Sequence, residues 1–505
     1  MSHSNPDLEQ PAEQPADNWC SSRRALLTTG LTAGLTAGLA ALAGKASAQS
    51  TGTDPGSSWL SLDARAARKM TYGVTAADLA LIQSRGFANW REDMLGLTIN
   101  DSASETAIQM MYPRLSMTAS QLGILTNDNV TLRNLGEATI LRAINSKNQL
   151  NERMVEFWTD HFNITGETVG GWLLVPHIQT VIRPNALGSF KNLLTAVCKS
   201  PAMLVYLNNN ENIGDFGNVN FARELLELHT MGTDGGYTQA DVKAVARCFS
   251  GWTYRNIRGA PDYGTFVCWD SQHSNLAKTV LGVNIPAGGG VSDGQTVINI
   301  LANHPSTALF IARKLARFLL QYDPPESVVN FAAREFLRTG GWIRAVVRAI
   351  LTPDNLKVAK PKFKRPFHLM VGALRQLQAQ VGDQGSLRGS HLIPAGHLPY
   401  TWDMPDGFPD QFEFWAGNLL PRWNFASMLP QNKVWNVIVN LPSLLGSAKT
   451  PDAVTIKIDQ LLFAGEMLPA DRANVLRYLK AKPINSRRIQ GAFAIALASP
   501  SYQWY

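Results

Sequence analysis

The sequence predicts a mainly α protein, a globular array of many helices with long connecting loops and at most one small hairpin. Apolar residues recur at helical spacing through most of residues 75–498, as they do in helices that bury one face. Alternation of apolar and polar residues, which marks a half-buried strand, is nearly absent. The composition, 45% hydrophobic and 17% charged, is typical of a folded globular protein. Together these observations favour packed helices over a large sheet.

The helices are assigned in chain order from this spacing. Thr75 and Asp78 form a capping-box pattern that opens the first helix, and Thr238 and Asp241 form a similar one. Further helices are expected over residues 132–150, 152–162, 190–199, 220–231, 239–250, 293–302, 307–321, 328–337, 343–351, 366–377, 435–440, 453–462, 470–480 and 486–498. A short hairpin is expected around 259–267.

The first 48 residues have the pattern of a twin-arginine export signal. Arg23 and Arg24 precede a weakly apolar run rich in Gly, Ala and Thr, and Ala46-Ser47-Ala48 form a cleavage box before Gln49. The expected partner during export is the twin-arginine translocase, and the expected location is the periplasm or the exterior. An uncleaved anchor is the alternative, but Gly and Thr make this run a poor membrane span. We therefore expect no stable transmembrane anchor.

The rest of the chain divides into three predicted parts. Residues 49–58 form a flexible lead, 59–383 the main helical body, and 384–505 a loop belt rich in aromatics and proline, followed by C-terminal helices packed on the main body. Three cysteines lie beyond the signal, so they cannot all pair with one another. Cys248 and Cys268 are the most plausible bridge by spacing, and three free thiols are the alternative.

Several classes of function are excluded by charge and by missing motifs. A net charge of +7 over 505 residues is too dilute for a nucleic-acid binder. The chain has no G-x-S-x-G elbow, phosphate-binding loop, dinucleotide fingerprint, haem-attachment motif or zinc-finger spacing. These absences remove the best-marked enzyme classes, but not catalysis by residues that are distant in sequence.

The most informative segment is NVNFARELLELHTMG at residues 218–232, followed by GYTQADV at 236–242. With FWTDHF at 157–162, the segment 183–194, SGW at 250–252 and KRPF at 364–367, it resembles the bacterial domain of unknown function 1800 family. The chain departs from the family pattern at Val219, where Glu is usual, and at Ser274, where Asp is common. The resemblance implies an exported, mostly helical protein of unestablished chemistry. It also implies a second exported protein as a partner, similar to sulfatases and alkaline phosphatases.

The 220–231 helix carries the first candidate site residues. At 100° per residue one arc holds Asn220, Arg223, Glu224 and Glu227, and the other arc is apolar. Glu224 and Glu227 are candidate acid/base groups or metal ligands, and Arg223 is a candidate anchor for an anion or carboxylate. Arg223 and Glu227 are also spaced to form an ion pair. The alternative is a solvated helix face with no role in chemistry.

Two histidines, His161 and His229, fall on the apolar sides of their helices. A single inward histidine is usually a hydrogen-bonded core residue. The alternative is that helices 152–162 and 220–231 pack together and bring both histidines to a carboxylate, as part of a catalytic site. Arg153, Glu156 and Asp160 share the polar face of the 152–162 helix.

Three further groups lie on expected loops. Asp270 and His273 would join Glu224 and Glu227 as metal ligands, or belong to an exposed loop without a role. The aromatic belt from Tyr400 to Pro409 would bind sugar rings or lock a loop to the core. Basic residues at 360–365, held between Pro361 and Pro366, would form solvated surface or a rigid turn that meets an anionic partner.

Two functions follow from these patterns. The first is a hydrolytic or other acid/base enzyme of the cell envelope that uses Glu224, Glu227, Arg223, His229 and His161. Its cofactor is not identified by the sequence, and a divalent metal is the candidate. The second is a non-catalytic scaffold or partner of the co-exported sulfatase- or phosphatase-like protein, in which the same residues specify helix packing.

Overall fold

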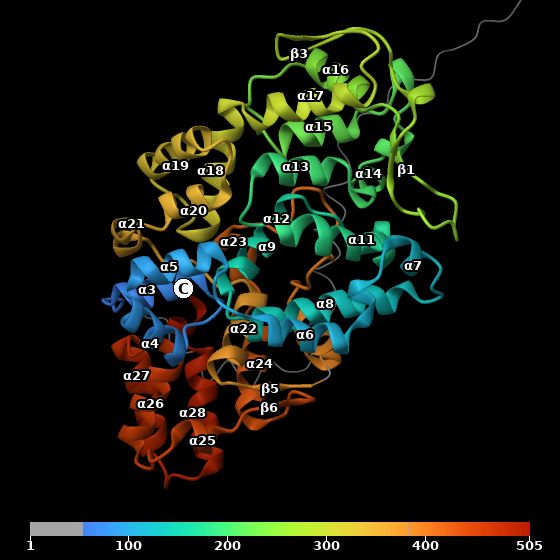
Figure 1. The fold of residues 1–505 in the computed structure, drawn as a ribbon. Helices are drawn as coiled ribbons and strands as arrows, with labels where there is room; N and C mark the ends of the chain where they lie inside the picture. The colour runs from blue at the N-terminus through green and yellow to red at the C-terminus, as the bar shows by residue number, and fades with distance from the viewer. Residues whose placement is uncertain (1–53, 383) are drawn as a thin grey trace, which may run out of the picture. The chain divides into compact units, whose positions relative to one another are not determined.

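The computed structural model describes residues 54–382 and 384–505. The predicted signal peptide and residues 49–53 of the flexible lead lie outside the described residues. Residues Pro55–Tyr505 form one compact unit built from helices, with strands confined to three short pairs (Figure 1). The prediction of a mainly α fold is confirmed.

The helices are named as in Figure 1. In the first half they are α3 (Leu62–Met70), α4 (Ala76–Arg85), α5 (Phe87–Gly96), α6 (Ser102–Met111), α7 (Ala119–Gly123), α8 (Asp128–Asn145), α9 (Gln149–His161), α10 (Gly166–Val169), α11 (Gly171–Pro176), α12 (Arg183–Asn185), α13 (Phe190–Cys198), α14 (Pro201–Tyr206), α15 (Asn220–Glu227) and α16 (Gln239–Phe249). The second half has α17 (Val291–Ala302), α18 (Pro305–Leu319), α19 (Glu326–Arg338), α20 (Ile343–Ile350), α21 (Pro353–Val358), α22 (Pro366–Gln376), α23 (Phe412–Ala416), α24 (Leu419–Met428), α25 (Leu441–Leu445), α26 (Pro451–Phe463), α27 (Pro469–Lys480) and α28 (Ser486–Ala498). Short 3-10 turns are η1 (Pro113–Ser116), η3 (Asn209–Glu211), η4 (Gly214–Phe216), η5 (Asp270–Gln272), η7 (Leu429–Gln431) and η8 (Pro500–Gln503), while η2 (His177–Ile182) and η6 (Leu387–Leu392) are π-helical.

Both predicted capping boxes are present, at the starts of α4 and α16. Most expected helices occur, with ends shifted by a few residues. Helix α15 is shorter than expected because the chain leaves the helix after Glu227 and reaches Gly232, whose φ is +81°. The spacing did not identify several helices, among them α3, α5, α6 and α24.

Within the described residues the strands form three antiparallel pairs, where the sequence predicted at most one hairpin. Strand β1 (Trp252–Tyr254) pairs with β2 (Phe266–Cys268), so the predicted hairpin segment 259–267 is the loop between them and the start of β2. Strand β3 (Lys278–Val280) pairs with β4 (Val283–Ile285) through a two-residue turn with positive φ at Leu281 and Gly282, as a tight hairpin turn requires.

The third pair corrects a predicted helix. Strand β5 (Gln380–Val381) pairs with β6 (Val437–Ile438), in the segment 435–440 that was expected to be helical. That expectation was wrong for a local reason. Asn436 has a φ of +56°, and Val437 and Val439 are buried on either side of the exposed Ile438, which is the two-residue period of a strand.

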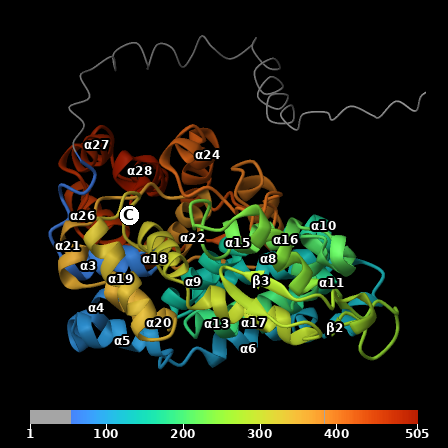
Figure 2. The same ribbon diagram turned by 90° about the horizontal axis from the view of Figure 1, so that it is seen from above.

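The apolar core has two large parts. The first is built mainly from α3 to α20. The second joins α24 to α28 with α22 and with the buried residues Ile140, Ala143 and Ile144 of α8. In both ribbon views α24, α26, α27 and α28 lie together (Figures 1 and 2). The C-terminal helices therefore share one core with α8 and α22 of the predicted main body.

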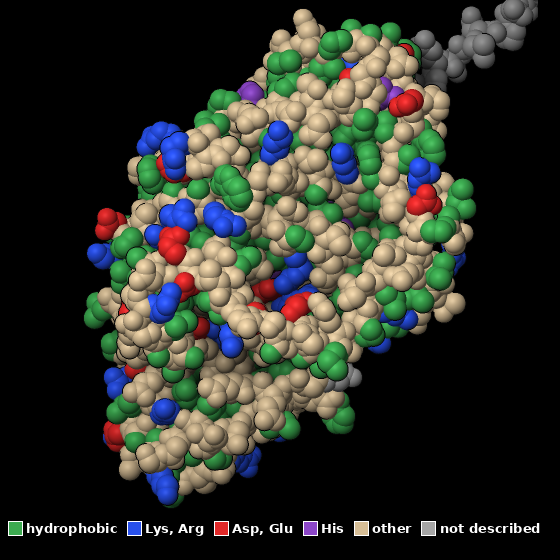
Figure 3. All heavy atoms as spheres, viewed as in Figure 1, with side chains coloured by type: hydrophobic (Ala, Val, Ile, Leu, Met, Phe, Trp, Pro, Cys, Tyr) green, Lys and Arg blue, Asp and Glu red, His purple; other side chains and the backbone are tan. Residues whose placement is uncertain are grey.

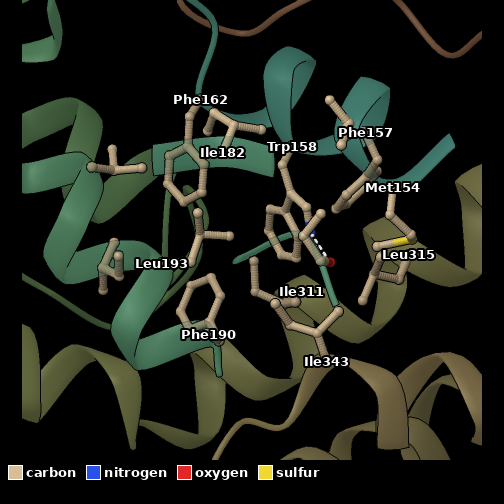
Figure 4. Close-up of a cluster of buried hydrophobic side chains, with 14 of the residues drawn as sticks. Met154, Phe157, Trp158, Phe162, Ile182, Phe190, Leu193, Ile311, Leu315 and Ile343 are labelled. Carbon is tan, nitrogen blue, oxygen red and sulfur yellow. Dashed lines mark hydrogen bonds between the residues drawn. The ribbon is translucent and has the colours of Figure 1, made fainter. Parts of the chain in front are cut away.

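Two of the motifs quoted for the family meet inside the first core. Trp158 of α9 is fully buried, and its indole Nε1 donates a hydrogen bond to the carbonyl oxygen of Ala186 at 2.9 Å. Its ring lies 5.8 Å from that of Phe162 and 5.9 Å from that of Phe190, measured between centroids. Figure 4 shows these rings packed among aliphatic side chains of α13, α18 and α20. These motif residues are explained by packing.

In the part of the chain that the structure describes, the three cysteines, Cys198, Cys248 and Cys268, are free thiols. Burial raises the pKa of Cys248 to about 12 and that of Cys268 to about 11. Of the two alternatives left open by the sequence, the structure has the three free thiols and not the Cys248–Cys268 bridge. Among the described residues, no helix has both the length and the apolar character needed to cross a membrane.

Candidate functional site

Helix α15 has the two faces that its sequence predicts. Phe221, Ala222, Leu225 and Leu226 are buried, and Arg223, Glu224 and Glu227 are half-buried on the other side. The expected ion pair between Arg223 and Glu227 is not among those within 4.0 Å in the described part of the chain. Burial and the neighbouring Glu227 raise the pKa of the Glu224 carboxyl, Arg223 opposes them, and Asp406 of the belt raises it further.

The two predicted histidines do come together. His161 Nε2 donates to the carbonyl oxygen of His229 at 3.1 Å, and the ring centroids are 6.1 Å apart. Each is only 1% exposed, and the charged group acting on both is Lys314, not a carboxylate. Burial, helped by Lys314, lowers the pKa of His229 to about 3 and that of His161 well below its ordinary value. Both rings are therefore neutral at physiological pH.

His273 lies in a separate buried network. Its Nδ1 donates to the carbonyl oxygen of Ser250 at 2.8 Å, and its Nε2 lies 3.1 Å from Asp293 Oδ2. The ammonium of Lys278 is 2.5 Å from the same carboxylate oxygen. Both ring nitrogens of His273 therefore have protein partners in this network. Lys278 and Asp293 were not expected here, and no sequence spacing pointed to them.

The proposed metal ligands are not assembled into a site. Within residues 54–382 and 384–505, no group of three or more His, Cys, Asp and Glu side chains is placed to hold a metal ion. Glu224 and Glu227 stay on α15, whereas Asp270 starts the turn η5 and His273 is bound to Asp293.

A buried cluster of ion pairs centred on Arg365 was not predicted as a site. The Arg365 side chain is 4% exposed, and its Nη1 lies 2.6 Å from Asp160 Oδ2 and 3.6 Å from Glu156 Oε1. Its Nη2 lies 3.6 Å from Asp410 Oδ1, and Lys362 Nζ is 2.7 Å from the other oxygen of Asp410. The basic turn at 360–365 is thus not the solvated surface that the sequence suggested, because Lys362 and Arg365 enter the interior to meet carboxylates.

Helix α9 supplies a stripe of three carboxylates to this region. Glu152, Glu156 and Asp160 follow one another at four-residue spacing, so they share one face of the helix. Glu152 accepts two hydrogen bonds from Arg183, at 2.7 and 2.9 Å, and Glu156 lies 2.7 Å from Nε2 of His368. In the space-filling view, basic and acidic side chains meet in a hollow over α8, α9 and α12 (Figure 3).

The two carboxyls that share Arg365 have pKa values shifted in opposite directions. Burial alone would raise the pKa of Glu156, but His368 and Arg365 outweigh it and hold that pKa well below its usual range. Burial raises the pKa of Asp160 from its ordinary 3.8 to about 7; Arg365 opposes this shift and Glu156 adds to it. Near neutral pH, Glu156 is therefore a fixed anion, whereas Asp160 gains and loses a proton.

Both carboxyls line a cavity of about 40 Å³, together with Thr159, His397 and Tyr400, which is room for one or two water-sized groups. The Nδ1 of His397 accepts a hydrogen bond from the backbone N–H of Phe367 at 3.3 Å. Burial, with Arg365 nearby, lowers the pKa of His397 well below its ordinary value. The ring is therefore neutral, and Nε2 is the nitrogen that carries its proton.

The belt is held against the end of α9. Asn163 donates from Nδ2 to the carbonyl oxygens of Trp402 and Met404, at 2.8 and 2.7 Å. Trp415 is 2% exposed, and its ring lies 4.8 Å from that of His397 between centroids. These contacts favour the interpretation of the belt as a loop locked to the core, and they place Asp410 beside Arg365.

Part of this cluster could have been found from the sequence. Arg153, Glu156 and Asp160 were assigned to one polar helix face, Asp160 lies in FWTDHF, and Arg365 lies in KRPF. Nothing in the sequence brings those motifs together, because Asp160 and Arg365 lie 205 residues apart along the chain. His397 and Asp410 had no signal beyond their place in the belt.

Comparison with known proteins gives a family but no characterised relative. No curated protein and no solved structure matches the chain significantly. The family model described as "Protein of unknown function (DUF1800)" matches residues 65–504, nearly the whole chain. The chain therefore belongs to the DUF1800 family.

Proposed function

We propose that this protein is an acid/base enzyme whose reacting proton is carried by Asp160, in the cavity between α9, α22 and the belt. Hydrolysis is the reaction class that we put forward. The observation that carries the proposal is the placement of Glu156 and Asp160 on one arginine at a cavity wall. When two neighbouring carboxyls lie in unequal environments, one commonly stays ionised while the other donates or accepts the proton.

Each group has a distinct role in this proposal. Glu156 stays ionised and, with Arg365, fixes the position of Asp160. The Nε2–H of neutral His397 is a hydrogen-bond donor for a substrate oxygen, where it would stabilise negative charge that develops in the reaction. His161 and His229 are neutral and buried, with their ring centroids 6.1 Å apart. They support the packing of α9 and α15 instead of moving protons.

The test is a pH profile on a substrate panel. Purified mature protein is assayed with chromogenic esters, phosphate monoesters, glycosides and peptides. The expected activity has a pH dependence with a turning point near 7. Removing a general acid or base costs about 10²- to 10⁴-fold, so Asp160→Asn should lose activity to that extent while its dichroism spectrum stays unchanged. Asp452→Asn, at an exposed pair with Lys480, is the control.

If no substrate is turned over, and a host carrying Asp160→Asn in place of the native gene grows exactly like one carrying Asp452→Asn, the acid/base proposal fails. If Glu224→Gln abolishes an activity that Asp160→Asn leaves intact, the site belongs on α15 instead. Both comparisons use folded protein, which the dichroism spectrum checks.

We also propose export by the twin-arginine pathway to the periplasm or the exterior. Arg23, Arg24 and the Ala46-Ser47-Ala48 box support this proposal. Replacing both arginines by lysine should stop export, and the exported form should begin at Gln49. An exported protein that keeps residues 1–48, or normal export of the double variant, would contradict it.

A second candidate function is that of a non-catalytic partner for a co-exported sulfatase- or phosphatase-like protein. The observation that favours it is a set of exposed apolar side chains after the belt: Leu420, Trp423, Trp435 and Ile438 are 67%, 48%, 72% and 55% exposed. Exposed aromatics of this kind are common in protein interfaces. Calorimetry with the purified candidate partner should show binding that Trp423→Ser and Trp435→Ser weaken and Asp160→Asn does not.

A further inference from the structure

A second cavity, of about 460 Å³, lies between α7, α11, α13 and the loop before β2. It shares no lining residue with the Asp160 cavity, and its volume falls in the range of small-molecule sites. Most of its wall is apolar, including Leu115, Leu173, Val181 and Phe266. Among the described residues that line it, none is acidic. The cavity therefore suits a ligand with an apolar body.

One wall carries hydrogen-bond donors. His177 is 2% exposed, and its Nδ1 is 2.8 Å from Ser200 Oγ. The other ring nitrogen, Nε2, is buried and has no hydrogen-bond partner among the described residues, and the same is true of the side-chain Nε2 of Gln179. Buried polar atoms without a partner are uncommon and costly. Both residues line the cavity, so a ligand there has two donors to satisfy.

A positive charge lies at the same cavity. Lys199, at the C-terminal end of α13, is one of the lining residues. Its ammonium lies 5.8 Å from the ring centroid of Phe266, another lining residue, and within the described chain no carboxylate lies within 4.0 Å of it. The π-helical turn η2 brings His177 and Gln179 to this wall, and such turns are frequent at functional sites.

We propose that this cavity binds a small carboxylic acid with an apolar body, its carboxylate held by His177, Gln179 and Lys199. Two neutral donors and one cation match the two oxygens and the charge of a carboxylate. When Ser200 donates its hydroxyl proton to Nδ1 of His177, the ring presents Nε2–H to the ligand. An ammonium ligand would be repelled by the Lys199 ammonium and would find no carboxylate among the described lining residues to pair with, so the same wall disfavours an amine.

The test is calorimetry on the mature protein with three probes of equal chain length: decanoate, decanol and decylamine. Decanoate should bind, and decanol should bind at least about 10-fold more weakly, because the carboxylate pairs with the Lys199 ammonium and an uncharged hydroxyl does not. Decylamine should not bind. Lys199→Met should reduce decanoate affinity about 10-fold and leave decanol unchanged. Lys191→Met, at an exposed lysine of the same helix, is the matched control.

Two variants that fill the cavity complete the test. Ala196→Trp and Met117→Trp place an indole in the space, and either should abolish binding of decanoate and decanol. Met117 is only half-buried, so its replacement keeps the test open if Ala196→Trp does not fold. Failure of decanoate to bind, equal affinity for decanol, or binding that survives filling would overturn the proposal. Asp160→Asn should bind decanoate normally, so this result is independent of the acid/base proposal.

Discussion

At the scale of single residues, the protein places many charges inside and pairs them. Arg365 serves three carboxylates, those of Asp160, Glu156 and Asp410. A buried ion pair contributes little net stability when intact, but losing one partner leaves an uncompensated charge away from water. The network therefore depends on its central guanidinium.

Arg365→Met should be strongly destabilising. It leaves three carboxyls in a buried site without their shared cation, and breaking a buried pair costs about 3–5 kcal/mol. Thermal and urea unfolding, followed by dichroism, measure the change. Arg338→Met removes an exposed pair with Glu335 and should cost less than about 1 kcal/mol. Equal effects of the two substitutions would show that the interior network is not under this electrostatic constraint.

Asp160 should give the stability a specific pH dependence. Its pKa is about 7 in the folded protein and 3.8 ordinarily, so between these values the folded state holds a proton that the unfolded state has lost. Stability contributed by this group therefore falls as pH rises from about 4 to about 7. Relative to Asp160→Asn, the native protein should lose about 2–3 kcal/mol between pH 5 and pH 8. Unfolding curves at several pH values check this, and parallel curves for the two proteins would refute the raised pKa.

The residue scale also shows what the sequence could predict. The inward placement of His161 and His229 followed from helical spacing, and the structure confirms that both are buried and that they meet. The ion pair of Asp160 did not follow from helical spacing, because Arg365, and Asp410 which shares it, come from segments that approach α9 only in the folded chain. Periodicity reports which face of a helix is buried, but not what lies opposite.

At the scale of elements, the belt is fixed to α9 by a close backbone approach. Gly407 has a φ of +77°, and a Cβ added there would lie 2.1 Å from the carbonyl oxygen of Asp160. Only glycine fits both the conformation and the space. The belt carries Asp410 to Arg365, and it carries His397 and Phe408 to the cavity, so this contact positions the proposed site.

Gly407→Ala should displace the belt. We expect a loss of at least about 2 kcal/mol, from the strained φ and the collision with backbone, together with loss of any activity that depends on Asp160. Gly417 is the control, since a Cβ there meets nothing within 4 Å, and Gly417→Ala should change stability by less than about 0.5 kcal/mol. Unfolding midpoints measure the loss of stability, and the substrate assay used for Asp160→Asn measures the loss of activity. A Gly407→Ala protein as stable as Gly417→Ala would contradict this account of the loop.

Helical spacing located the long helices, but it did not identify elements whose structure depends on a distant segment. Long amphipathic helices such as α16, α18 and α28 were located from their spacing. The segment 435–440 was misassigned because its apolar run is too short for periodicity to separate strand from helix. Its strand character depends on pairing with β5, a contact with a segment more than fifty residues away in the sequence.

At the scale of the whole molecule, the second core crosses the predicted boundary between residues 383 and 384. Leu369, Met370 and Leu374 of α22 are fully or almost fully buried in a cluster with Phe425, Ile458 and Phe493 of the C-terminal helices. Arg68 of α3 pairs with Glu466 at 2.6 Å, and Phe363 forms an isolated bridge with Trp504. The two predicted parts therefore complete each other's interior.

The fragment 54–383 should consequently not fold stably alone. Without residues 384–505, several apolar side chains of α8 and α22 face water, each at a cost of about 1.5–3 kcal/mol, and Lys362 and Arg365 lose Asp410. Expressed alone, the fragment should be insoluble or lack near-ultraviolet dichroism, whereas co-expression with 384–505 should recover a complex. The intact chain should unfold in one transition. A soluble fragment with a cooperative transition of its own would instead establish the boundary at 383 as a domain boundary, and would confine the Asp410 contacts to an interface between two independent folds.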